Sequence, residues 1–191
     1  MTTTTNPGKV ITGLVRFSYV HVFEAVALEE GQEKKFSVSL IIPKSDNETV
    51  DKINAAVEAI KAQVKAKNGG KLPAKFKLPL RDGDEERPDD EAYANSYFLN
   101  ANCKPQPGVV GPLKDKDGKP LPITDPAQLY SGCYGRASIN FYAFDTKGNK
   151  GIACGLNNLQ KLRDGEHLGG RSRAEDDFSD DLPMDDGDLL D

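Results

Sequence analysis

The 191-residue sequence contains no tryptophan, only two histidines and only three cysteines. The cysteines Cys103, Cys133 and Cys154 are widely spaced and form no CxxC pair, so neither a disulfide framework nor a zinc site is expected. No apolar run approaches the about 18 residues of a membrane span, and the first residues lack the apolar centre of a signal peptide. We therefore expect an intracellular protein with reduced thiols, no metal and no other cofactor.

Recognised signatures of enzyme active sites are also missing. The sequence has no GxxxxGK[ST], no GxGxxG after a strand, no HExxH and no GxSxG. Seven acidic residues between positions 82 and 91 could in principle hold Mg²⁺ for phosphodiester cleavage. They lie in a Pro- and Gly-punctuated segment, however, where like charges repel one another and a solvated loop is expected. We predict that the chain is not an enzyme, with a Mg-dependent nuclease as the minor alternative.

Charge is divided unevenly along the chain, although the net charge is only -5. Residues 174–191 hold nine Asp and Glu and no Lys or Arg, which leaves 25 basic and 21 acidic residues in the rest of the chain. A mildly basic body thus precedes an acidic tail. The tail has too little apolar content to fold alone, so we expect it to be disordered.

Hydrophobic periodicity indicates strands in most of the body. Residues 10–26, 34–43 and 96–102 are rich in β-branched and aromatic residues, and residues 134–145 and 150–156 flank a TKGN turn as in a β-hairpin. The one long helix is predicted over residues 46–68, with Ser45 and Glu48 as a capping box. Residues 71–95 are expected to be irregular, and a short helix is expected to follow Asp125.

This pattern predicts a mainly β fold, specifically an OB-like small Greek-key barrel with one long inserted helix, long loops and a disordered C-terminal tail. The predicted organisation is a flexible N-terminus at residues 1–8, an OB-like domain at residues 9–170, and a disordered acidic tail at residues 171–191.

Binding of unpaired nucleic acid requires a positive groove for the phosphates and aromatic faces on which bases stack. Tyrosines suit this role because a phenol can lie half exposed with its hydroxyl in water. Arg136 lies two residues from Tyr134 and can share its face of a strand, whereas Arg16 would need a bulge to share a face with Tyr19. The predicted DNA-binding residues are Tyr134, Arg136, Tyr142, Tyr97, Tyr19, Arg16, Lys34, Lys35 and Lys104.

The tail combines a polyanion with isolated apolar residues. A flexible run of carboxylates could occupy a DNA groove when DNA is absent, and the apolar positions could anchor partner proteins, although a general solubilising tail is the simpler alternative. The predicted partner-binding residues of the tail are Phe178, Asp180, Asp181, Leu182, Met184, Leu189 and Leu190.

The body resembles a family of bacteriophage single-stranded DNA-binding proteins with an OB fold. The resemblance covers Val10 to Gly165 and is carried by SVSLIIPK, SGCYGRASINFYAF and GIACGLNNLQKLRDGE. Separately, the run Asp180 to Met184 resembles the acidic tails of bacterial and phage single-strand binders, although no phenylalanine ends the chain.

The resemblance implies a protein that coats and protects single-stranded DNA during phage replication, recombination or repair in the cytoplasm of the infected host. Replication or recombination proteins would bind the tail, and copies could associate along the DNA. The main rival from another class is an interaction adaptor that binds no DNA and uses its acidic tail to dock a basic partner.

Overall fold

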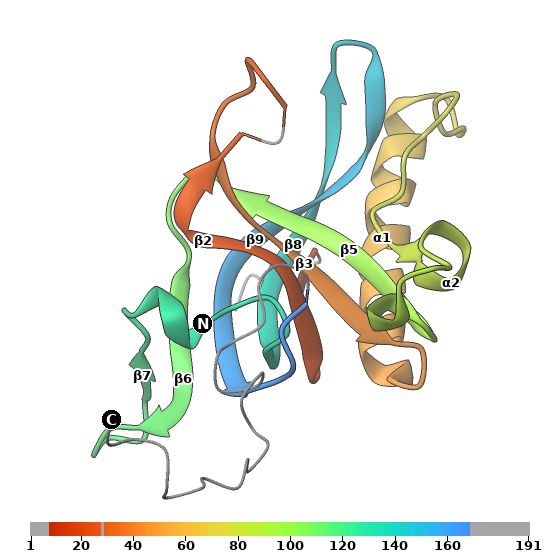
Figure 1. Cartoon of the computed structure of the whole chain (residues 1–191). Coiled ribbons are helices and arrows are strands. Elements are labelled where there is room, and N and C mark those ends of the chain that lie inside the picture. Colours follow the sequence, from red (N-terminus) through yellow and green to blue (C-terminus); the bar gives the residue numbers. More distant parts are fainter. Residues whose placement is uncertain (1–7, 28, 169–191) are drawn as a thin grey trace, which may run out of the picture.

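Strands make up most of the regular structure in residues 8–27 and 29–168, the part of the chain that the computed structural model describes (Figure 1). The strands are β1 (Lys9–Ile11), β2 (Val15–Val26), β3 (Lys35–Pro43), β4 (Arg81–Asp82), β5 (Ser96–Cys103), β6 (Gly108–Lys114), β7 (Pro120–Pro122), β8 (Tyr134–Thr146) and β9 (Asn149–Arg163). The helices are α1 (Asn47–Lys67), the short α2 (Gly83–Glu86), and the 3₁₀ turns η1 (Glu91–Tyr93) and η2 (Pro126–Gln128).

Five long strands pair in a closed ring in the order β2, β3, β5, β9, β8 and back to β2. All the pairs are antiparallel except β5 with β9, which is a short parallel junction at Ala101–Cys154 and Asn102–Gly155. The ring closes where Val15 pairs with Gly135. The structure is therefore mainly β, with a sheet closed into a ring and one main helix, and the predicted fold class is confirmed.

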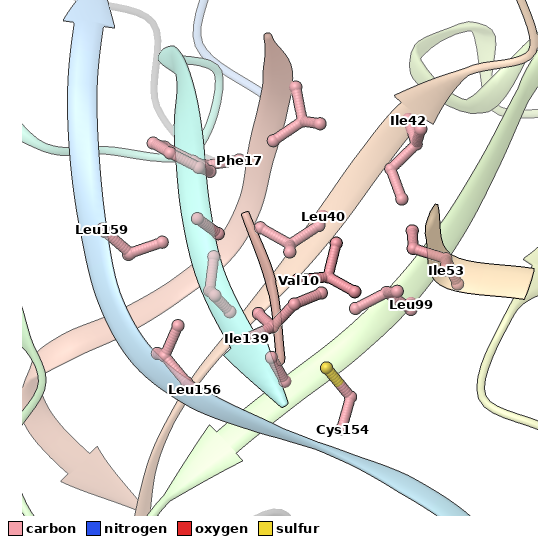
Figure 2. Close-up of a cluster of buried hydrophobic side chains, with 14 of the residues drawn as sticks. Val10, Phe17, Leu40, Ile42, Ile53, Leu99, Ile139, Cys154, Leu156 and Leu159 are labelled. Atoms are coloured by element: carbon pink, nitrogen blue, oxygen red, sulfur yellow. The ribbon is translucent and has the colours of Figure 1, made fainter. Parts of the chain in front are cut away.

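The ring encloses one apolar core, which Figure 2 shows from within. Alternation along β3 directs Val38, Leu40 and Ile42 inward, and each is at most 1% exposed. The apolar stripe of α1, with Ile53 fully buried, packs against the same core, so the helix covers one side of the ring (Figures 1 and 2). The cysteines are free thiols, and burial raises the pKa of Cys154.

The start of α1 explains why the predicted first strand is divided into β1 and β2. Asp46, not Ser45, caps the helix, because its carboxylate accepts hydrogen bonds from the backbone N–H and the hydroxyl of Thr49. The Thr49 hydroxyl in turn accepts a 2.8 Å bond from the backbone N–H of Gly13. A Cβ at Gly13 would lie 2.6 Å from the Asp46 carboxylate, so only glycine fits at this break.

The acidic excursion after α1 is more ordered than expected. Lys44 forms ion pairs of 2.8 Å with both Asp82 and Asp84, and these contacts lower the pKa of each carboxylate and raise that of the lysine. β4 pairs with β5, which fixes this segment against the outside of the ring. Asp82 and Asp84 therefore do not lie in an irregular loop of unpaired charges as expected, because both are paired with Lys44, which directly follows β3; Asp84 is still exposed.

Two parts of the chain were assigned less well from the sequence. The Pro- and Gly-rich segment before residue 125 contains the hairpin of β6 and β7, although no strand was predicted there. Residues 157–163, beyond the predicted end of the hairpin at residue 156, continue β9 between β8 and β6. The short turn η2 after Asp125 is present as expected. Within the described part of the chain, no helix is long and apolar enough to cross a membrane.

Candidate nucleic-acid interface

A groove runs over the outer face of the ring, on the side where β2, β3 and β5 lie next to one another. It consists of two adjoining hollows, which share Ser37 and Asn102 and which we call together the front groove. The polar hollow, of about 200 Å³, is lined by Tyr19, His21, Ser37, Ser39, Arg87, Asn100 and Asn102 among others. The loop hollow, of about 490 Å³, is lined by residues that include Val26, Gly31, Gln32, Glu33, Lys35, Thr146 and Lys147.

The place of the front groove in the ring suits it to bind an extended strand. β3 and β5 are the second and third strands of the ring, and the loop hollow lies between the β2–β3 loop and the β8–β9 turn. Both connections project from the same end of the ring, at the top of Figure 1. OB folds bind oligonucleotides on the corresponding strands and loops.

Tyr19 reaches the groove through a bulge in β2. Simple alternation would place it on the inner face with Phe17, which is fully buried. The register between β2 and β3 shifts between Ser18 and His21, and Tyr19 has a φ of 48°, a conformation uncommon for a residue with a side chain. Its ring is consequently turned outward and is 55% exposed. Strained backbone of this kind is concentrated at binding sites.

Arg87 holds this tyrosine in place from the acidic excursion. Its guanidinium lies over the ring of Tyr19 at 5.6 Å, that of Tyr93 at 4.8 Å and that of Phe98 at 5.2 Å. It also donates a 3.4 Å hydrogen bond to the hydroxyl of Tyr19. Sequence reasoning missed Arg87; the one available signal was a single arginine in an otherwise acidic run.

Basic side chains gather at the loop end of the groove. Lys35 and Lys147 line the loop hollow. Phe36 on β3 pairs with Cys103 on β5. Lys34, just before β3, and Lys104, just after β5, therefore lie at the same end of these two antiparallel strands. Lys104 is partnered by Glu33 at 3.2 Å. Of the three predicted lysines, the structure places Lys35 in the lining of the loop hollow, and it adds Lys147, which was not predicted.

Comparison with protein families identifies the chain. The model of the family described as "Enterobacter phage Enc34, ssDNA-binding protein" matches residues 8–190. The chain belongs to this family. Because the family is one of DNA-binding proteins and not of enzymes, the prediction of a non-enzymatic chain is confirmed. The resemblance drawn from SVSLIIPK and the two C-terminal segments is confirmed as well.

Individual proteins are similar to this chain over nearly its whole length. Protein p50 of Acyrthosiphon pisum secondary endosymbiont phage 1 is 30% identical over 189 residues, covering 92% of this chain and 95% of the relative. The single-stranded DNA-binding protein of bacteriophage Enc34, solved in complex with ssDNA, superposes with a TM-score of 0.72 at 25% identity, covering 86% of this chain and 91% of that protein. The gp2.5 protein of bacteriophage T7 shares the fold at 16% identity, with a TM-score of 0.57 and coverage of 96% and 98%.

The predicted pair Tyr134 and Arg136 shares the outer face of β8, as the two-residue spacing indicates. Each side chain already has partners within this Enc34 family member, however. The guanidiniums of Arg16 and Arg163 lie 5.2 and 4.5 Å from the centre of the Tyr134 ring, and Arg136 donates a 2.9 Å hydrogen bond to the amide oxygen of Gln160. Neither residue lines the front groove, so their role in DNA binding stays a prediction.

The other predicted platforms lie elsewhere on the ring. Tyr97 is half buried beside the ammonium of Lys44, 5.2 Å from the centre of its ring. Tyr142 lies on the outer face of β8 and is 40% exposed. Partial burial of its side chain raises the pKa of its phenol. Arg16 donates hydrogen bonds to the carbonyl oxygens of Gly132 and Glu166. None of these three lines the two hollows.

The tail residues predicted to bind partners, Phe178 to Leu190, lie outside the described residues. The last described residue, Leu168, packs against Ile41, Tyr93 and Phe98 on the outside of the ring. Its backbone N–H donates a 2.9 Å hydrogen bond to the carbonyl of Ser131. Because Arg87 contacts Tyr93, Phe98 and also Tyr19, the described chain ends beside the polar hollow.

Proposed function

We propose that the chain binds single-stranded DNA in the front groove and coats it during phage replication, recombination or repair. The observation that carries this proposal is the position of Tyr19. Its strained backbone turns the ring outward at one end of the groove, and Lys35 and Lys147 line the other end. The related Enc34 protein was solved in complex with ssDNA. The setting is the cytoplasm of the infected host, where copies would associate along the strand.

The polar hollow suits the base of a nucleotide, and the loop hollow suits its phosphate. The exposed face of Tyr19 offers a stacking surface, and base–aromatic stacking contributes about 1–3 kcal/mol per base. Lys35 and Lys147 neutralise phosphates, so counterions are released and the logarithm of affinity falls by about 0.7 per log unit of salt for each contact. Binding by these means is largely independent of sequence.

The acidic tail competes with DNA for the same surface in this proposal. The described chain ends at Leu168, in contact with the cluster that Arg87 joins to Tyr19. From there, residues 171–191 have an extended reach of about 70 Å. A run of carboxylates tethered at this point has a high effective concentration at the groove. When DNA displaces it, Phe178, Leu182 and Met184 become available to replication or recombination proteins.

A fluorescence anisotropy titration with labelled oligo-dT tests the proposal. The full chain, a chain ending at residue 170, and a full-length chain with every Asp and Glu after residue 173 changed to Asn or Gln are compared at fixed salt. We expect all three to bind, and the last two to bind more tightly. The amide chain is the matched control, because it keeps the length of the tail and removes only its charge.

Three outcomes contradict parts of the proposal. Binding by none of the chains removes the assignment and favours the adaptor alternative. Equal affinity of all three leaves DNA binding in place and removes competition by the tail. Cleavage of the oligonucleotide on addition of Mg²⁺ would favour the nuclease alternative; among the described residues, no group of three His, Cys, Asp or Glu side chains is placed to hold a metal.

A further inference from the structure

The floor of the polar hollow contains a buried hydroxyl without a hydrogen-bond partner. Ser39 is only 2% exposed, and no described residue pairs with its hydroxyl oxygen. Buried polar groups are nearly always hydrogen-bonded, because an unpaired one loses its interaction with water and gains nothing in return. Because Ser39 also lines the polar hollow, a ligand bound there is a candidate for the missing partner.

Three further polar side chains surround Ser39 on the same face. Ser39 pairs across β3 and β5 with Asn100, and Ser37 pairs with Asn102, so the four side chains form two adjacent cross-strand pairs. All four line the polar hollow. Within the described part of the chain, the amides of Asn100 and Asn102 form no side-chain hydrogen bond. The floor therefore presents unused donors and acceptors of both kinds.

The polar hollow also has an aromatic side, in contrast to its polar floor. Tyr19 and Arg87 line it, and the contacts of Arg87 fix the orientation of the tyrosine ring. A planar ligand that stacks on Tyr19 would direct its edge at the floor. The volume of about 200 Å³ suits one flat ring system and not a run of stacked ones. The loop hollow next to it carries the lysines, which suit phosphates.

From this arrangement we infer that the polar hollow is a base pocket: it takes one unstacked nucleobase of the bound strand and reads its hydrogen-bonding edge through Ser39, Asn100 and Asn102. This inference rests on the proposed function and extends it. Stacking and phosphate contacts accept any base, whereas hydroxyl and amide groups that contact a base edge distinguish one base from another. Binding is thus base-selective at one position in each site.

Homopolymers of thymine, uracil and cytosine deoxynucleotides, of equal length, test this inference with the full chain. Thymine and cytosine differ mainly in the hydrogen-bonding edge, and deoxyuridine separates the effect of the methyl group. We expect the wild-type affinities for oligo-dT and oligo-dC to differ about 5- to 10-fold, the effect of one or two net hydrogen bonds. Ser39→Ala and Asn100→Ala should each bring the ratio of these affinities closer to one.

Ser138→Ala is the matched control, because Ser138 is on the outer face of β8 and lines neither hollow. It should leave the ratio unchanged. Ser39→Ala should melt at or above the wild-type temperature, since it removes an unpaired buried hydroxyl, so a loss of selectivity cannot be attributed to unfolding.

The inference is overturned if wild-type protein binds the three homopolymers equally, or if both variants in the pocket keep the wild-type ratio. A protein that binds no homopolymer at all would instead contradict the proposed function. If oligo-dU binds differently from oligo-dT while oligo-dC binds like oligo-dT, the protein contacts the thymine methyl group. That result would also overturn the inference that the pocket recognises the hydrogen-bonding edge of the base.

Discussion

Two clusters of tyrosine and arginine lie on the outside of the ring, and they differ in what the aromatic ring faces. At one, Tyr134 has two guanidiniums over its ring, and a Cβ at Gly165 would lie 2.7 Å from the ring edge, so the surrounding chain already occupies it. At the other, the guanidinium of Arg87 lies over the ring of Tyr19, which is still 55% exposed beside a polar hollow. The first cluster closes the ring, and the second opens onto the groove.

Residue type alone therefore does not distinguish a packing role from a binding role. Arg16 and Arg163 stabilise the junction where β8 meets β2 and β9, because a guanidinium over an aromatic ring is favourable wherever both are held in place. Arg87 makes the same kind of contact, but Tyr19 is still 55% exposed. Exposure of the remaining face decides which ring can stack on a base.

The largest expected effect is on DNA affinity at the open cluster. Tyr19→Ala removes the stacking surface and should weaken binding of oligo-dT about 5- to 150-fold, corresponding to about 1–3 kcal/mol. Tyr19→Phe is the control: it keeps the ring and loses only a 3.4 Å hydrogen bond from Arg87, so most of the affinity should remain. Equal losses in both variants, measured by fluorescence anisotropy, would argue against stacking.

At the closed cluster we expect the main effect on stability. Tyr134→Ala removes the ring that joins Arg16 and Arg163 and should lower the free energy of unfolding by about 1–2 kcal/mol. Affinity for oligo-dT should change little once the protein is folded. Urea denaturation followed by circular dichroism measures the first quantity. A large loss of affinity with unchanged stability would instead indicate that Tyr134 binds DNA and does not serve mainly in packing.

The lysines at the loop end of the groove should affect the salt dependence of DNA affinity, with the largest loss of affinity at low salt. Lys35→Ala and Lys147→Ala should each lower the slope of log affinity against log salt by about 0.7, the value for one phosphate contact on a single strand. Lys161→Ala, whose side chain is paired with Asp164 away from the groove, serves for comparison. A slope that stays constant in both groove variants would exclude direct phosphate contacts.

The smallest expected effect concerns the segment that carries Arg87. Lys44 lowers the pKa of Asp82 and Asp84, so its ion pairs stabilise the fold above the usual aspartate pKa of about 4 and lose that contribution as the pH falls below it. Lys44→Gln should therefore melt slightly below the wild type at pH 7, and the difference in melting temperature should shrink as the pH falls through the lowered pKa values of the two carboxylates. A difference that persists in acid would point to lost packing, not lost charge.

Local patterns in the sequence were sufficient for most of the elements. β3, β5 and the hairpin of β8 and β9 follow the period-2 alternation that places one set of side chains in the core, and α1 follows its apolar stripe. The helix start was predicted one residue early, because Ser45 and Asp46 are both good caps and only the contact with Thr49 selects Asp46.

The candidate site was predicted only in part. Tyr19, Lys35 and the lysines near it were selected as aromatic and basic residues on strands, but Tyr134 and Arg136 were preferred because a regular strand puts them on one face. The bulge that turns Tyr19 outward has no local signature, and Arg87 reaches the groove across 68 residues of sequence. Contacts this distant depend on how the acidic excursion packs on the ring.

By itself, the sequence determined the mainly β fold, the long helix, the division of charge between body and tail, and the family. These depend on composition, periodicity and overall similarity, which can all be obtained from the linear order of the residues. Only the tertiary structure decided which tyrosine is open and which is enclosed, and where Ser39, Asn100 and Asn102 meet. That information arises when strands from different parts of the chain pair and fix the exposed face of each side chain.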